Sequence, residues 1–114
     1  MANYRIYQVT TFTIRPERRI EGEKWWQNTG KGLIESLPGV KSVHAYAAQF
    51  GLGSEYQLEV WTELESYAAL DEWDRTIAAN PQKYRGFGEA AQYFEYGPGR
   101  VVGDWPASDL LSEG

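Results

Sequence analysis

The chain has 114 residues and a formal net charge of −5 at pH 7, and this length fits one domain with a modest core. The acidic balance and the lack of a basic run argue against nucleic acid and anionic membrane surfaces as partners. The absence of cysteine excludes disulfides and thiolate chemistry. No apolar run approaches the roughly 18 residues of a membrane span, and the N-terminus lacks a signal-peptide core. We therefore expect a soluble cytoplasmic protein.

The first predicted element is a strand over Tyr4–Ile14, where Tyr, Ile, Val, Thr and Phe dominate. Both of its faces mix polar and apolar residues, which indicates a central position in a sheet. A helix is predicted from Pro16, which suits a first helical turn, to Leu37. Its periodic positions are Trp26, Thr29, Leu33, Ile34 and Leu37.

Three glycines interrupt this predicted helix, at Gly22, Gly30 and Gly32. Each weakens a helix interior by about 0.5–1 kcal/mol relative to Ala. They either let the helix sit close to the sheet or leave room for a ligand between the two layers. Pro38-Gly39 then ends the helix.

The stretch Val40–Trp61 reads as a hairpin, because two β-capable runs flank the short loop Gly51–Ser54. A turn closed by that loop places Phe50 opposite Glu55, so paired residue numbers sum to 105. Directly opposed residues share a face of the sheet. One face is then apolar, formed by Val43, Ala45, Ala47, Leu58 and Val60. The other is polar and aromatic, formed by His44, Tyr46, Ala48, Gln57, Glu59 and Trp61. A one-residue slip would mix the two sets.

The second helix is predicted from a capping box at Thr62 and Glu65, through Trp73 to Ile77. Asn80-Pro81 interrupts it, and Pro81 opens a short further helical segment. A fourth strand is predicted over Ala91–Tyr96, broken by Gly97-Pro98-Gly99, with Arg100–Val102 as a possible continuation.

The resulting order β-α-β-β-α-β is the ferredoxin-like arrangement, an α+β fold with a four-stranded antiparallel sheet. We expect one domain over residues 1–102. The acidic stretch 103–114 forms a C-terminal tail that is disordered or lies against a partner subunit.

Several short motifs resemble the antibiotic-biosynthesis-monooxygenase-like group of the dimeric α/β barrel superfamily. They are Leu37-Pro38-Gly39-Val40, Leu58-Glu59-Val60-Trp61, Glu65-Ser66-Tyr67 and Asn80-Pro81-Gln82-Lys83-Tyr84. The resemblance spans most of residues 4–96 and is more specific for fold than for activity. It implies a homodimer with a shared barrel and a pocket in each subunit between sheet and helices.

Relatives in this superfamily include cofactor-free monooxygenases of polycyclic phenols, polyketide cyclases and haem-degrading enzymes. The chain departs from the group in two ways. Its second helix is about two turns longer before Asn80-Pro81, and it lacks the helix histidine that haem-degrading members use. Haem degradation is therefore not expected.

His44, Tyr46 and Glu59 are the candidate catalytic residues. A histidine can take a proton from an activated phenol or a β-dicarbonyl carbon. In this hypothesis Glu59 orients the imidazole and Tyr46 holds the enolate oxygen. The alternative is that this polar face is the dimer-facing wall of the barrel, with its polar groups satisfied across the two-fold axis.

A second candidate site lies on the apolar face, where small alanines leave space beneath aromatic helix residues. Such a cavity suits a flat polycyclic ligand, and the alternative is an ordinary packed core. The expected substrate-binding residues are Trp26, Asn28, Trp61, Tyr67 and Trp73. Trp25 is an alternative to Trp26 above this space, and Asn28 or Arg75 could supply polar contacts to the ligand.

The leading hypothesis is a cofactor-independent monooxygenase-like enzyme that acts on an aromatic or polyketide-type small molecule. The alternatives are a polyketide cyclase of the same fold and a non-catalytic dimeric module that binds a small ligand. We expect no bound cofactor and no metal, since one histidine and scattered carboxylates lack ligand spacing. The expected partners are a second copy of the chain and the small molecule.

Overall fold

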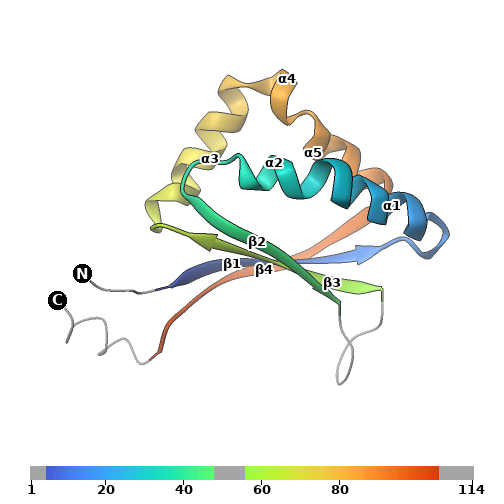
Figure 1. Cartoon of the computed structure of the whole chain (residues 1–114), viewed down its shortest axis with the longest axis horizontal. Coiled ribbons are helices and arrows are strands. Elements are labelled where there is room, and N and C mark those ends of the chain that lie inside the picture. Colours follow the sequence, from blue (N-terminus) through green and yellow to red (C-terminus); the bar gives the residue numbers. More distant parts are fainter. Residues whose placement is uncertain (1–4, 48–55, 106–114) are drawn as a thin grey trace.

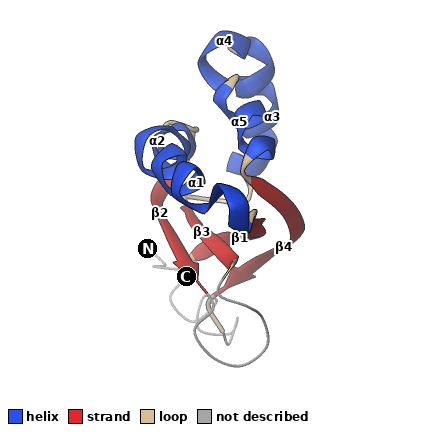
Figure 2. Cartoon of the chain, turned by 90° about the vertical axis from the view of Figure 1, so that its right-hand side faces the viewer, coloured by secondary structure: helices blue, strands red, loops and turns tan. Residues whose placement is uncertain are grey.

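A four-stranded antiparallel sheet forms one layer of the molecule, in the order β2-β3-β1-β4. The computed structural model describes residues 5–47 and 56–105. The strands are β1 (Ile6–Ile14), β2 (Val40–Ala47), β3 (Gln57–Leu64) and β4 (Phe94–Gly103). The described helices cover one face of the sheet and leave the other face open (Figures 1 and 2). The predicted ferredoxin-like α+β fold is confirmed.

Strand β1 is central, as its mixed faces predicted. It pairs with β3 on one side and β4 on the other. Its ends, Ile6 and Ile14, are buried beneath the helices, and Val9 on the open face has 0% exposure. A strand that contributes to both faces in this way is expected to carry apolar residues on both.

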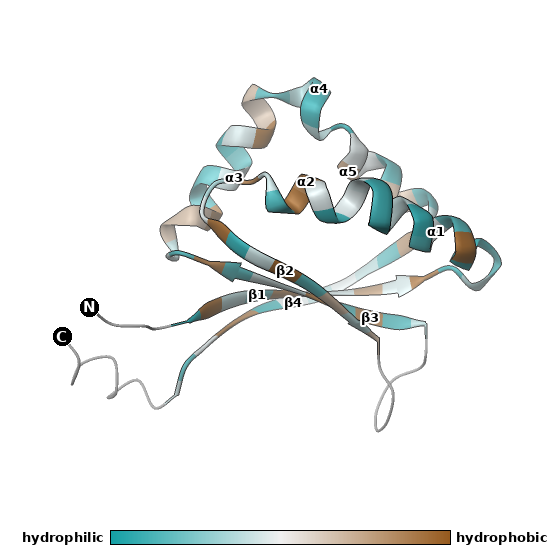
Figure 3. Cartoon of the chain, in the orientation of Figure 1, coloured by the Kyte–Doolittle hydropathy of each residue, from teal (hydrophilic) through white to brown (hydrophobic). Residues whose placement is uncertain are grey.

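The β2–β3 hairpin has the predicted register. His44 lies opposite Trp61, Tyr46 opposite Glu59 and Ala47 opposite Leu58, so paired numbers sum to 105. In Figure 3 hydrophobic and hydrophilic positions alternate along β2, as expected for a strand with one covered face. The predicted turn Gly51–Ser54 and the Phe50–Glu55 pair lie outside the described residues.

The first helical layer runs as a 3₁₀ turn (Pro16–Arg18), α1 (Arg19–Trp25), a π-helical turn (Trp26–Gly30) and α2 (Lys31–Glu35). Two of its glycines permit close packing. A Cβ on Gly22 would lie 2.9 Å from Cδ1 of Ile14, and one on Gly30 would lie 2.4 Å from Cζ3 of Trp25. Gly22 therefore lets the helix approach the sheet, and Gly30 accommodates an indole ring.

The turn after α2 is fixed by Gly39, whose φ is +75°. An L side chain rarely adopts this conformation, and a Cβ here would also lie 2.6 Å from Cβ of Ala69. The helix ends at Glu35, slightly before the predicted end at Leu37, and Pro38-Gly39 lie in the turn that follows.

The second helical layer begins later than the capping box predicted. The elements are α3 (Ala68–Ala79), α4 (Pro81–Tyr84), α5 (Gly86–Glu89) and a 3₁₀ turn (Ala90–Gln92). Thr62 is no N-cap, because β3 continues to Leu64 and Thr62 pairs with both Gln8 and Val43. Two ladders of backbone hydrogen bonds outweigh one local cap at this position.

The last strand begins later than predicted and has no break at Gly97-Pro98-Gly99, and its predicted continuation over Arg100–Val102 is confirmed. Ala91 lies in the 3₁₀ turn, and β4 runs unbroken from Phe94 past Pro98 to Gly103. Its pairing with β1 shifts between Thr10 and Phe12, opposite the Gly-Pro-Gly stretch. An edge strand with a bulge tolerates a proline because the missing N–H need not enter the ladder.

The apolar core is divided between the two ends of β1. One buried cluster consists of Ile6, Leu64 and Ala69. The other consists of Ile14, Ala90 and Phe94. The middle of the sheet lies between these clusters and carries the site described below. Within the described part of the chain, no helix is both long enough and apolar enough to cross a membrane.

Candidate functional site

A cavity of about 530 Å³ lies between the middle of the sheet and the helices. Its size falls within the range of about 300–1,000 Å³ that is typical of small-molecule sites. The cavity is lined by residues from all four strands, from the first helical layer and from α3 and α5. A ligand held here would therefore contact nearly every element of the fold.

The floor of the cavity follows from strand alternation. Gln8, Thr10 and Phe12 of β1 point to the helix side, and Thr62 of β3 is the direct partner of Gln8. On the edge strand β2 the side chain of Ala45 is too small to fill the space above it. The predicted apolar hairpin face is thus the face that the helices cover.

One side of the cavity is aromatic. The ring centroid of Phe12 lies 6.0 Å from that of Phe94 and 5.0 Å from that of Tyr96. The ring of Trp25 lies 5.9 Å from Phe94. Among the described residues, Nε1 of Trp25 is the one buried side-chain nitrogen or oxygen that has no hydrogen-bond partner. An orphaned buried donor costs about 1–3 kcal/mol, so a ligand oxygen that reached it would bind favourably.

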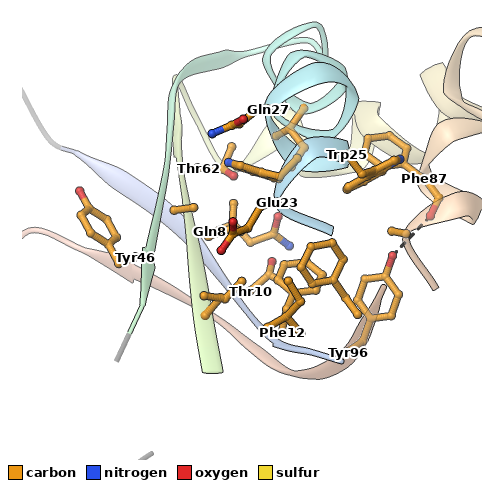
Figure 4. A pocket seen from close by; sticks show the side chains of 18 of the residues that line it. Gln8, Thr10, Phe12, Glu23, Trp25, Gln27, Tyr46, Thr62, Phe87 and Tyr96 are labelled. Carbon is orange, nitrogen blue, oxygen red and sulfur yellow. Dashed lines mark hydrogen bonds between the residues drawn. The ribbon is translucent and has the colours of Figure 1, made fainter. Parts of the chain in front are cut away.

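The other side of the cavity is polar. Figure 4 shows Gln8, Thr62, Glu23 and Gln27 on one side, whereas Trp25, Phe87 and Tyr96 lie on the other. Glu23 and Gln27 are four residues apart on the first helical layer and therefore share a helix face. Glu23 Oε1 lies 3.9 Å from Nε of Arg19, a separation at which an exposed ion pair contributes little.

Tyr96 supplies a hydroxyl at the aromatic side. The hydroxyl donates to the backbone oxygen of Phe87 at 3.5 Å. Tyr96 as a whole is 58% exposed, yet burial raises the pKa of its phenol above the ordinary value of 10.0. The group therefore stays a neutral donor at physiological pH.

This pKa shift predicts a loss of stability at high pH. Between the unfolded pKa of 10.0 and the higher folded value, the folded state holds a proton that the unfolded state has released. The free energy of unfolding then falls as the pH rises through that window. Urea unfolding measured below and above pH 10 should show a smaller fall in the free energy of unfolding for Tyr96→Phe than for the wild type. Equal losses would contradict this assignment.

The predicted catalytic residues gather on the open face, and of the three only Tyr46 borders the cavity. The His44 and Tyr46 rings lie 6.3 Å apart, as do those of Tyr46 and Trp61. Tyr46 borders the cavity at the β2 edge, but its ring lies beyond β2 in Figure 4. Glu59 Oε1 accepts from Nε1 of Trp61 at 3.0 Å. The Glu59 carboxylate also lies 3.7 Å from Nη1 of Arg100.

Glu59 is therefore engaged by Trp61 and Arg100, and within the described residues no hydrogen bond joins it to His44. The roles predicted for His44, Tyr46 and Glu59 stay predictions.

Some of the predicted substrate-binding residues border the cavity and others do not. Trp26 and Trp73 border the cavity, and Nε1 of Trp73 donates to the carbonyl of Pro38 at 2.9 Å. Asn28 and Tyr67 are exposed and do not border the cavity, and Trp61 lies on the open face. Their roles in binding likewise stay predictions.

Several cavity residues were not anticipated from the sequence. They are Gln8, Thr10, Phe12, Glu23, Gln27, Phe87 and Tyr96. Two patterns could have indicated some of them: the alternating Gln8, Thr10 and Phe12 of the first strand, and the four-residue spacing of Glu23 and Gln27 around Trp26.

Neither a family model nor a curated protein matches the sequence. Solved structures do match the fold. A NIPSNAP family protein of unknown function from Agrobacterium tumefaciens superposes with a TM-score of 0.71 at 13% identity, over 96% of each chain. A NIPSNAP domain protein from Burkholderia xenovorans gives 0.66 at 19% identity, over 90% of this chain and 95% of that one.

A further match is SnoaB, a cofactor-independent oxygenase from Streptomyces nogalater. Its TM-score is 0.60 at 12% identity, over 86% of this chain and 90% of that chain. These structures share the ferredoxin-like α+β fold of this chain, and antibiotic-biosynthesis-monooxygenase-like proteins are among them, so the resemblance is confirmed at the level of fold. Proteins of this fold class include an oxygenase and NIPSNAP proteins of unknown function.

Proposed function

We propose that the protein binds a flat, mainly apolar small molecule of aromatic or polyketide type in the cavity and oxygenates it without a bound cofactor. The observation that carries the proposal is the aromatic-lined cavity of about 530 Å³ with a polar side. The likeness in fold to a cofactor-independent oxygenase supports the choice of reaction.

The reaction starts with removal of a proton from a carbon or phenol that the substrate's own rings and carbonyl activate. The resulting carbanion supplies electrons to dioxygen, which is the oxidant. An activated CH₂ becomes a carbonyl, one oxygen atom enters the product, and the other leaves as water with the two hydrogens. The four electrons lost by the carbon equal the four gained by dioxygen.

Glu23 is the group that we propose accepts the proton. Among the described residues that border the cavity, Glu23 is the one that carries a carboxylate. The neutral Tyr96 hydroxyl stands on the aromatic side and becomes a donor for substrate oxygen when its proton turns away from the long, 3.5 Å contact with the backbone oxygen of Phe87. The alternative base is His44 on the open face, and the two assignments are separable by mutation.

Oxygen uptake with an anthrone-type compound and no additive tests this proposal. We expect turnover by the wild type, and its loss in Ala45→Phe, whose ring fills space above the floor. Ala78→Phe, at an exposed α3 position that does not border the cavity, is the matched control and should retain turnover. Activity in Ala45→Phe equal to the wild type would exclude the cavity.

Two further variants identify the base. We expect Glu23→Gln to reduce turnover at least tenfold and His44→Ala to leave it intact. The opposite result would support the predicted His44 site on the open face instead.

A second candidate function is ligand binding without chemistry. The observation that favours it is that the one histidine of the sequence lies outside the cavity, which leaves Glu23, an exposed carboxylate, as the base. In that case calorimetry would detect binding of the anthrone-type compound, whereas oxygen uptake would stay at the uncatalysed rate.

We also propose that the open sheet face joins two copies of the chain. It presents an aromatic cluster in which the ring of Trp61 packs edge-on against Tyr7, with centroids 5.5 Å apart, and against Tyr46. The described helices leave this face uncovered (Figure 2). Clustered exposed aromatic side chains are typical of association surfaces.

A further inference from the structure

We infer that the cavity selects an uncharged ligand that has a neutral hydrogen-bonding group, such as an amide or hydroxyl, at one end of a flat aromatic body. Ligands whose head group is a carboxylate or phosphate are rejected. This inference rests on the proposed function, because it concerns the substrate of the same cavity.

The aromatic body is assigned to the side formed by Phe12, Phe94, Tyr96 and Trp25. Their rings meet at tilted or edge-on angles between 57° and 65° and so line a slot with ring faces and edges. Offset and edge-on contacts are the arrangements that aromatic rings prefer, so a flat ring system fits between these side chains.

The head group is assigned to Gln8, Thr62 and Gln27. Gln8 and Thr62 are direct partners on neighbouring strands, and Gln27 lies on the same side of the cavity in Figure 4. Among the described residues, no side-chain hydrogen bond involves Gln8, Thr62 or Gln27. Each glutamine offers both an N–H donor and a carbonyl acceptor, and the threonine hydroxyl can do either. This set matches an amide or a hydroxyl, which also donates and accepts.

Charge excludes anionic head groups. The described residues that border the cavity include no lysine and no arginine, whereas Glu23 stands on the polar side. Sites that bind carboxylate or phosphate use cationic side chains or arrays of backbone N–H groups. An anion placed here would meet a carboxylate of like charge without a compensating cation.

Calorimetric titration with naphthalene, 2-naphthamide and 2-naphthoate tests the inference, because the last two compounds differ mainly in charge. We expect the wild type to bind the amide at least tenfold more tightly than the carboxylate. Glu23→Gln should reduce the ratio of the amide affinity to the carboxylate affinity several-fold. The matched control is Glu21→Gln on the same helix, which removes an equal charge away from the cavity and should leave the ratio unchanged.

Gln8→Leu and Thr62→Val test the head-group assignment. Each variant should bind 2-naphthamide with an affinity reduced toward the affinity for naphthalene. The naphthalene affinity itself should hold in both variants, which shows that the cavity remains folded.

The inference is overturned if the wild type binds 2-naphthoate as tightly as 2-naphthamide, or if Glu23→Gln and Glu21→Gln change the ratio equally. In either case, naphthalene binding that is lost in Ala45→Phe would still support the proposed function. If naphthalene fails to bind the wild type at all, the cavity itself is excluded as a ligand site and both proposals fail.

Discussion

Replacing Gly30 with alanine is expected to lower the free energy of unfolding by about 1–3 kcal/mol, as overpacking of a well-packed site does. The added methyl group would lie 2.4 Å from Cζ3 of Trp25, so the indole must leave its place. Because Trp25 is part of the aromatic side of the cavity, the same substitution should abolish ligand binding. Urea unfolding and calorimetric titration with naphthalene measure the two effects.

Gly32→Ala is the matched control. Gly32 lies two residues further along the same helical run, and a Cβ there meets nothing within 4 Å. We expect this variant to gain about 0.5–1 kcal/mol from helix propensity and to bind ligand normally. If Gly30→Ala also gained stability, the indole would not occupy the position that the structure gives it.

Trp61→Arg is expected to convert a dimer into a monomer. Native mass spectrometry should show the wild type near twice the chain mass of 13.0 kDa and the variant at the mass of one chain. Trp61 lies between Tyr7 and Tyr46 on the open face, and it also lies opposite His44. An arginine in that position would remove the packed indole and place a charge in the interface beside Glu59, where desolvating the charge and losing the aromatic packing are both costly.

A substitution in the helical layer is the control for this prediction. Asp74→Arg changes charge at an exposed α3 position and should leave the dimer intact. Circular dichroism would show that both variants are folded. A wild type that is monomeric at micromolar concentration, or a Trp61→Arg variant that remains dimeric, would contradict the assignment of the open face as an interface.

The sequence was sufficient for the hairpin because its two faces differ so sharply. Ala45 opposite Val60 and Tyr46 opposite Glu59 could belong to one register only, since a slip would bury a carboxylate. The prediction of a helix N-cap at Thr62 was wrong for the opposite reason. A threonine followed three residues later by a glutamate satisfies a capping box on its own, but strands that are distant in sequence decide its conformation.

The site was harder to predict than the fold. Its polar side combines Gln8, Thr62 and Gln27, which come from three separate elements, and no spacing within the chain links them. The first strand also gave no clear choice of face, because Val9 is buried on the open side. The histidine attracted attention through its chemistry, although the predicted register, which the structure has, already placed it on the face opposite the apolar one.

The division of the apolar core has a thermodynamic consequence. The clusters around Ile6 and around Ile14 stand at opposite ends of the central strand, and the space between them is the cavity. A bound molecule would therefore act as part of the hydrophobic core. Since a ligand that binds only the folded state adds about 2.7 kcal/mol at a concentration 100 times its Kd, a molecule in this cavity would raise the free energy of unfolding of the whole domain by joining its two core clusters.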